Sequence, residues 1–277
     1  MKRLRILAVF LAAVLCVVLG AILRGRSNET ETVLFGGAAG GRVRVQDKDE
    51  FRDPVEVNRE PDDGIDWPDI TLSELQDNRQ YAIVNDKHLL SSAFEPEAGR
   101  ISGSTQLFDV NALPYLENML QDLRDHGYHP YLAGAYRTYS YQEKLFNGKA
   151  SQIALGLDPP VTDYNDPRYQ EAVQQARRIT AYPGSSEHQL GLAVDILDRE
   201  RSWLDYSKMD QDFFAYLDSI CASYGFIKRY PADKLPLTGW EEPYHYRYVG
   251  VEVATFIMEH GICYEEFYAH YDKDFEY

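Results

Sequence analysis

The chain has 277 residues, a hydrophobic content of 44% and a formal net charge of −16. That length and hydrophobic content suffice for a folded domain with a buried core. A nucleic-acid-binding protein needs a basic surface that displaces phosphate counterions, so the strong negative charge argues against nucleic acid as a partner.

The first 28 residues have the pattern of a membrane anchor. Basic residues precede an uncharged apolar run at positions 6–23, and Arg24 and Arg26 follow it. This run is near the minimum length for spanning a bilayer, roughly 18–20 residues, and no small-x-small cleavage signal is clear at its end. The positive-inside rule places residues 1–5 in the cytoplasm. We therefore expect an uncleaved single-pass anchor in the cell membrane with an extracytoplasmic domain. A cleaved signal peptide is the alternative, and it would also export the chain.

Residues 29–70 are rich in Gly, Asp, Glu, Asn and Pro and show no sustained periodicity. This composition predicts a flexible linker that holds a domain of residues 71–277 away from the membrane. Within that domain, an exported location permits a disulfide between Cys221 and Cys263. Both cysteines lie in apolar surroundings, so buried free thiols are an equal alternative, and neither has the spacing of a zinc site.

The domain interleaves predicted helices and strands without a regular βαβ rhythm, which is typical of the α+β class. Ser73 is a candidate cap for a short first helix. Longer helices are expected at 110–126, 140–148, 166–179, 210–224 and 251–260. Strands are expected at 81–84, 131–135, 192–196, 226–230 and 245–249.

His188 and Asp195 stand out because a glycine turn and a short apolar strand separate them. A loop that ends in histidine, followed by a returning strand, can bring both side chains to one point. Imidazole and carboxylate are good zinc ligands. A histidine and aspartate pair alone is equally well explained as a structural hydrogen bond.

His245 makes a metal site the stronger interpretation, because catalytic zinc needs three protein ligands and an open position. His188, Asp195 and His245 would supply them. Glu242, three residues before His245, is the candidate general base that takes a proton from water and gives it to the leaving amine. Glu241 is the next candidate, and a solvated acidic pair is the non-catalytic alternative for both glutamates.

The segment from Ser186 to Asp195, Ser-Glu-His-Gln-Leu-Gly-Leu-Ala-Val-Asp, together with Glu242-Pro-Tyr-His245, resembles VanY-type D-alanyl-D-alanine carboxypeptidases. That family is related to D-Ala-D-Ala dipeptidases, lysostaphin-like endopeptidases and the hedgehog signalling domain. The similarity extends over roughly residues 75–270. Further matching motifs are Gly134-Ala-Tyr-Arg137-Thr, Gln142, Tyr182-Pro-Gly184, Tyr224-Gly-Phe226, Arg229-Tyr-Pro231 and Thr238-Gly239. Tyr244 is a small departure, since the family often has tryptophan there.

The resemblance implies a small antiparallel sheet flanked by helices, with a zinc cleft. It also implies that Arg137 binds the terminal carboxylate of the substrate, which suits a guanidinium because the two groups form paired hydrogen bonds. A catalytic role for Arg137, in which it polarises the scissile carbonyl, is expected as well, and a surface arginine at a strand end is the non-functional alternative. Gln142 and Ser186 are expected to bind substrate as well. For Ser186, a structural loop hydroxyl is an equal alternative.

The expected function is zinc-dependent removal of the terminal D-alanine from peptidoglycan stem peptides ending in D-Ala-D-Ala. The closest alternative is an L,D-carboxypeptidase that acts on tetrapeptide stems. A non-catalytic zinc-containing module that binds the cell wall is a third, less favoured, alternative.

Overall fold

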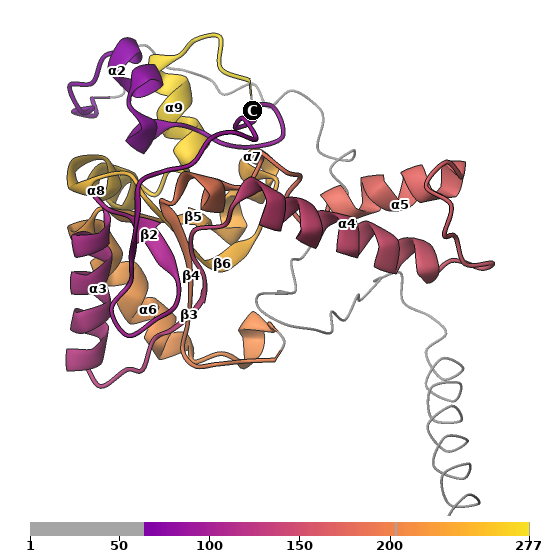
Figure 1. Ribbon diagram of the computed structural model, residues 1–277. Helices are drawn as coiled ribbons and strands as arrows, with labels where there is room; N and C mark the ends of the chain where they lie inside the picture. Colours follow the sequence, from indigo (N-terminus) through magenta and orange to yellow (C-terminus); the bar gives the residue numbers. More distant parts are fainter. Residues whose placement is uncertain (1–63, 203, 277) are drawn as a thin grey trace, which may run out of the picture. The chain divides into compact units, whose positions relative to one another are not determined.

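The computed structural model describes residues 64–202 and 204–276 (Figure 1). The predicted membrane anchor and most of the predicted linker lie outside these residues and stay predictions. Within the described ranges, every helix is too short or too polar to cross a bilayer.

A four-stranded antiparallel sheet forms the centre of the described domain (Figure 1). Its order is β3 (Tyr131–Gly134), β4 (Ala193–Leu197), β6 (Glu242–Tyr248) and β5 (Phe226–Tyr230). A separate two-stranded sheet pairs β1 (Ala98–Arg100) with β2 (Leu107–Asp109). The expected α+β class with a small antiparallel sheet is confirmed.

One face of the main sheet is buried under α3 (Leu113–Asp125) and α6 (Gln211–Ile220). Alternation along each strand decides which side chains enter this core. Val194 and Ile196 of β4 and Tyr246 of β6 pack with Leu116 and Phe213 from the helices. Asp195 and His245, at the intervening strand positions, therefore belong to the opposite face.

A second apolar cluster joins the other side of β5 to α8 (Val251–His260) and α9 (Tyr264–Tyr271). The short helix α2 (Leu72–Asp77) contributes Leu75 to the same cluster. Trp67 stacks on His270 with ring centroids 3.7 Å apart, and the Tyr271 hydroxyl donates to the carbonyl of Pro68. The packed domain therefore begins before residue 71, inside the segment that we expected to be linker.

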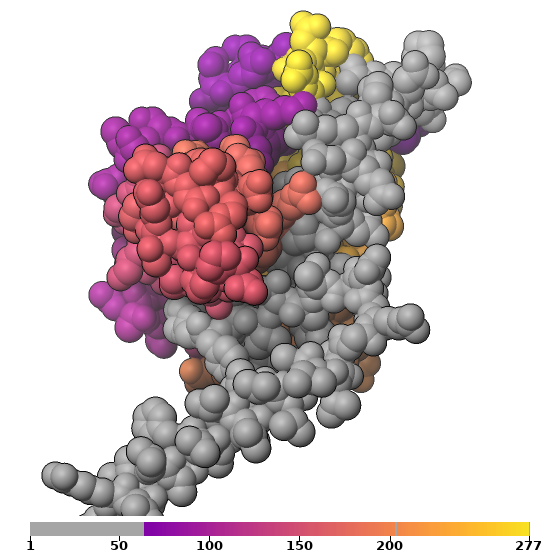
Figure 2. All heavy atoms as spheres, turned by 90° about the vertical axis from the view of Figure 1, so that its right-hand side faces the viewer, coloured from indigo at the N-terminus to yellow at the C-terminus, as the bar shows by residue number. Residues whose placement is uncertain are grey.

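The helices α4 (Tyr139–Leu155) and α5 (Pro167–Arg177) lie against each other and share a small core of their own. They lie to one side of the main sheet in Figure 1, and they face the viewer in Figure 2. Thr138 caps α4 by accepting a hydrogen bond from the amide of Tyr141. Since Arg137 directly precedes this cap, the start of α4 fixes the backbone beside a predicted site residue.

Most of the expected elements are confirmed within a few residues, and the Asp166 side chain caps α5 by accepting a hydrogen bond from the amide of Arg168. The helix expected at 140–148 continues to Leu155. Shorter helical turns are η1 (Arg79–Tyr81), η2 (Glu187–Leu190), η3 (Tyr206–Lys208), η4 (Cys221–Tyr224), η5 (Ala232–Lys234) and α7 (Leu235–Thr238). Cys221 and Cys263 are both buried free thiols.

Two predictions near the start of the domain are wrong. Thr71 rather than Ser73 caps α2, because its hydroxyl and the Glu74 carboxylate form a reciprocal capping box. The strand expected at 81–84 is a helical turn followed by irregular backbone. The Arg247 guanidinium accounts for this, since it donates to the carbonyls of Gln80 and Ala82 that a strand would use for pairing.

Candidate metal centre

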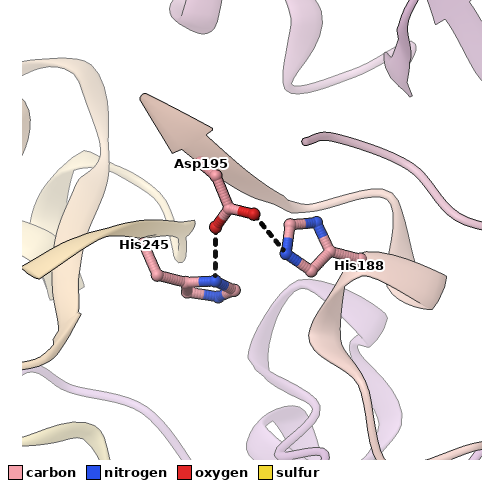
Figure 3. A group of neighbouring side chains, drawn as sticks. All are labelled: His188, Asp195 and His245. Atoms are coloured by element: carbon pink, nitrogen blue, oxygen red, sulfur yellow. Dashed lines mark hydrogen bonds and ion pairs between the residues drawn. The ribbon is translucent and has the colours of Figure 1, made fainter. Parts of the chain in front are cut away.

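Three buried side chains form a cluster of ligand type: His188, Asp195 and His245 (Figure 3). One ligand atom from each lies within 4.8 Å of the others. Asp195 and His245 are directly opposite each other on the paired strands β4 and β6, so their side chains share a face of the sheet. His188 reaches them from η2, which ends at Gly191 in a left-handed conformation with φ of 76°. The structure thus brings together the three predicted metal ligands.

The Asp195 carboxylate lies between the two imidazole rings (Figure 3). Its Oδ1 atom is 3.0 Å from Nδ1 of His245, and its Oδ2 atom is 3.3 Å from Nε2 of His188. The other nitrogen of His188, Nδ1, lies 2.8 Å from the carbonyl of Ala135. A hydrogen bond to that carbonyl places the proton on Nδ1 and leaves the Nε2 lone pair facing the cluster.

The electrostatic environment separates the two histidines. Burial lowers the pKa of His188 to about 4, and the nearby Arg137 acts in the same direction. Burial would also lower the pKa of His245, but its hydrogen bond to Asp195 and the nearby Glu187 carboxylate raise it to about 9. Burial disfavours the charged form of Asp195, yet the two histidines hold its pKa well below the usual value. The cluster therefore presents a carboxylate and a neutral imidazole as ready ligands.

Glu242 lies at the first position of β6, with Oε2 3.5 Å from Nδ1 of His245. In a regular strand, a residue three positions away would face the opposite side. The pairing of β5 with β6 shifts register between Lys228 and Tyr230, opposite the start of β6, and such irregularities re-aim side chains. Burial raises the pKa of Glu242 to about 7, against the opposing effect of His245. A carboxylate of this pKa is suited to exchanging protons near neutral pH.

Arg137 reaches the same cluster from the loop between β3 and α4. Its Nη2 atom is 3.0 Å from Oδ2 of Asp195 and 3.1 Å from Nε2 of His188. Gln142 lies behind it in α4, fully buried, with Oε1 3.4 Å from Nη1 of Arg137. The Gln142 amide also donates to the carbonyl of Ala181. Both ends of Gln142 thus have protein partners, so the residue holds Arg137 in place, and its direct contact with substrate stays a prediction.

Ser186 directly precedes η2 and is 4% exposed. Its neighbour Ser185 donates a hydrogen bond to the carbonyl of Tyr182, whereas the Ser186 hydroxyl has no hydrogen-bond partner within residues 64–202 and 204–276. A serine used only to stabilise a turn normally bonds nearby backbone. The geometry therefore leaves this hydroxyl available for a ligand.

Reasoning from sequence missed a group of buried charges behind His245. Glu187 lies between Arg229 and Arg247, and Arg229 also pairs with Glu265 of α9. These partners come from strands and helices far apart in the chain. The signal in the sequence was weak: Glu187 stands beside His188 of the cluster, and Arg229 stands within a predicted strand.

The backbone of Gly134 makes room for the cluster. A Cβ atom at this position would lie 2.7 Å from Oδ2 of Asp195 and 2.9 Å from Nη2 of Arg137. Gly134→Ala should therefore weaken zinc affinity roughly 10-fold, because relieving the overlap costs about 1–3 kcal/mol. The measurement is competition with a chromophoric chelator.

The matched control is Gly148→Ala in α4, where an added Cβ has nothing within 4 Å. This change should raise the free energy of unfolding by about 0.5–1 kcal/mol, because alanine favours a helix, and leave zinc affinity unchanged. Equal zinc affinity in both variants would contradict the close approach at Gly134.

Comparison with known proteins points to one family. Residues 105–251 match the family described as VanY, D-alanyl-D-alanine carboxypeptidase. A D-alanyl-D-alanine carboxypeptidase of Enterococcus faecalis (strain ATCC 700802 / V583) is 34% identical over 203 residues, which cover 71% of this chain and 69% of the relative.

Two solved structures are similar in fold. One is a mutant of the vancomycin-resistance D,D-pentapeptidase VanY in complex with Zn(II), with a TM-score of 0.56 and 33% identity, covering 69% of this chain and 99% of that one. The other is the LD-carboxypeptidase LdcB, with a TM-score of 0.57 and 27% identity, covering 68% and 85%.

Proposed function

Because the chain belongs to the VanY family of D-alanyl-D-alanine carboxypeptidases and is a peptidase, we propose that it is a zinc-dependent D,D-carboxypeptidase acting on peptidoglycan stem peptides. The bond to be cut precedes the terminal D-alanine of a stem that ends in D-Ala-D-Ala. The observation that carries the proposal is the buried cluster of His188, Asp195 and His245, with Glu242 only 3.5 Å from one ligand atom.

The residues present suit zinc. Two imidazoles and one carboxylate form a donor set typical of catalytic zinc, where three protein ligands leave one position open. The orientation of His188 supports this, since its hydrogen bond to Ala135 turns Nε2 toward the cluster. Zinc in such a site supplies a Lewis acid that activates water and polarises the scissile carbonyl.

Glu242 would act as general base and then as general acid. Its carboxylate takes a proton from the attacking water and gives it to the departing amine of D-alanine. A pKa of about 7 allows both transfers, because protonated and deprotonated forms are both accessible near neutral pH.

Arg137 would bind the free carboxylate at the end of the substrate. A guanidinium and a carboxylate form two parallel hydrogen bonds, which fix the orientation of the terminal residue. Ser186 is a buried residue whose hydroxyl has no partner in the described part of the chain, and it would bond the same terminal residue. Together these two residues would favour substrates in which a single residue with a free carboxylate follows the scissile bond.

The similarity to LdcB favours one second candidate, an L,D-carboxypeptidase that removes D-alanine from a tetrapeptide stem. Mass spectrometry of products from synthetic pentapeptide and tetrapeptide stems separates the two. We expect the pentapeptide alone to lose one alanine, a strong chelator to stop the reaction, and added zinc to restore it.

Two results would overturn parts of the proposal. Loss of alanine from the tetrapeptide alone would replace the D,D activity with the L,D activity. Hydrolysis that continues at full rate in a strong chelator would exclude the assigned role of zinc.

A further inference from the structure

We propose that Glu187 is a positioning residue for the metal centre: its carboxylate accepts a hydrogen bond from Nε2–H of His245 and so directs Nδ1 of that ring to the metal. The inference rests on the proposed zinc site and adds a residue outside the three ligands. Neither the ligand pattern nor the general base involves Glu187.

The two atoms concerned face each other in the interior. Oε2 of Glu187 lies 3.4 Å from Nε2 of His245, and their side chains are 0% and 4% exposed. Within the described part of the chain, neither atom forms a well-aligned hydrogen bond with any group. Buried polar atoms are nearly always paired, so each is the natural partner of the other. On the opposite edge of the ring, Nδ1 faces Asp195 and Glu242.

The other oxygen of Glu187 is held by two arginines. Oε1 accepts a hydrogen bond of 2.8 Å from Nε of Arg229 and lies 3.1 Å from Nη1 of Arg247. Arg229 donates two further hydrogen bonds to Glu265, and Arg247 donates to the backbone carbonyls of Gln80 and Ala82. The carboxylate is therefore fixed by β5, β6 and α9, and the charges of the two glutamates and two arginines cancel.

This arrangement predicts an unusual effect of the isosteric change Glu187→Gln. The amide oxygen would stay at the Oε1 position, because Nε–H of Arg229 donates to it and the positive charge of Arg247 lies 3.1 Å away. The amide NH2 group would then face Nε2 of His245 and would favour that nitrogen as an acceptor. The proton of a neutral ring would move to Nδ1, the atom needed for the metal. Glu187→Ala removes the acceptor but introduces no competing donor.

The first test measures zinc affinity by chelator competition and Tm after chelation, with the full chain. Glu187→Gln should bind zinc about 10–100-fold more weakly, the usual cost of losing a partner of a ligand histidine. Glu187→Ala should lower Tm more than Glu187→Gln does, but it should reduce zinc affinity less than Glu187→Gln does. If Glu187 had a purely structural role, the variant with the lower Tm would also be the variant with the lower zinc affinity.

The matched control is Glu265→Gln, which removes the same charge from the same group of residues but has no contact with His245. It should lower Tm and keep zinc affinity close to that of the wild type. A loss as large as in Glu187→Gln, or wild-type affinity in Glu187→Gln, would overturn the proposal. If the wild type bound no zinc, the metal site itself would fail, and this inference with it.

A second test needs no variant. In zinc-loaded protein with 15N-labelled histidine, Nε2–H of His245 should give a downfield proton signal that exchanges slowly with water. Rapid exchange of that proton would show that Glu187 does not hold it.

Discussion

Replacing Glu242 with glutamine should lower kcat by roughly 10²–10⁴-fold while the protein keeps its zinc, since this is the usual contribution of a positioned general base. The amide has the same shape but cannot accept the proton of the attacking water. Glu242 is outside the three-ligand cluster, so zinc content and affinity should be unchanged. The measurements are steady-state kinetics on the pentapeptide stem and metal analysis of the purified protein.

Glu241→Gln is the control for Glu242→Gln, because it makes the same chemical change one position earlier. It should leave kcat unchanged. If Glu242→Gln kept full activity and Glu241→Gln lost it, the general base would be Glu241. If Glu242→Gln lost zinc together with activity, Glu242 would be a ligand or a structural support of the site rather than its base.

The grouping of His188, Asp195 and His245 could be predicted because residue type and order carry most of the information about it. A histidine, a glycine turn and a strand ending near an aspartate define one half of the site, and His245 completes it. Sequence periodicity could not provide the pairing that places Asp195 opposite His245. That contact depends on the order of strands in the sheet, which no local pattern determines.

Contacts between distant segments account for what the sequence did not predict. The segment at 81–84 has the composition of a strand, but its neighbouring carbonyls bond the Arg247 guanidinium instead of another strand. Gln142 was expected in the pocket, and its location behind Arg137 depends on the carbonyl of Ala181 from another loop. Glu187 was visible beside His188, but its role depends on arginines from β5 and β6.

Arg137→Gln should lower kcat/KM on the pentapeptide stem by about 100-fold. Hydrogen bonds to charged groups contribute about 1.5–3 kcal/mol, and 1.4 kcal/mol corresponds to a tenfold change. Arg168→Gln on α5 is the control, because it removes the same charge from a partly exposed ion pair, and it should leave kcat/KM unchanged. Arg137→Lys should recover only part of the activity, because an ammonium group lacks the planar fork of the guanidinium.

A cycle with an altered substrate tests what Arg137 contacts. A pentapeptide with a C-terminal amide lacks the negative charge that Arg137 is proposed to bind, so the wild-type enzyme should cleave it far more slowly. If the guanidinium and that carboxylate interact, Arg137→Gln should lower kcat/KM on the amidated peptide only a little further, because each change removes the same contact. If the two defects multiply, Arg137 acts elsewhere, and its distances of 3.0 and 3.1 Å to Asp195 and His188 make the scissile carbonyl the alternative target. Zinc content measured on the same samples separates either outcome from damage to the metal site.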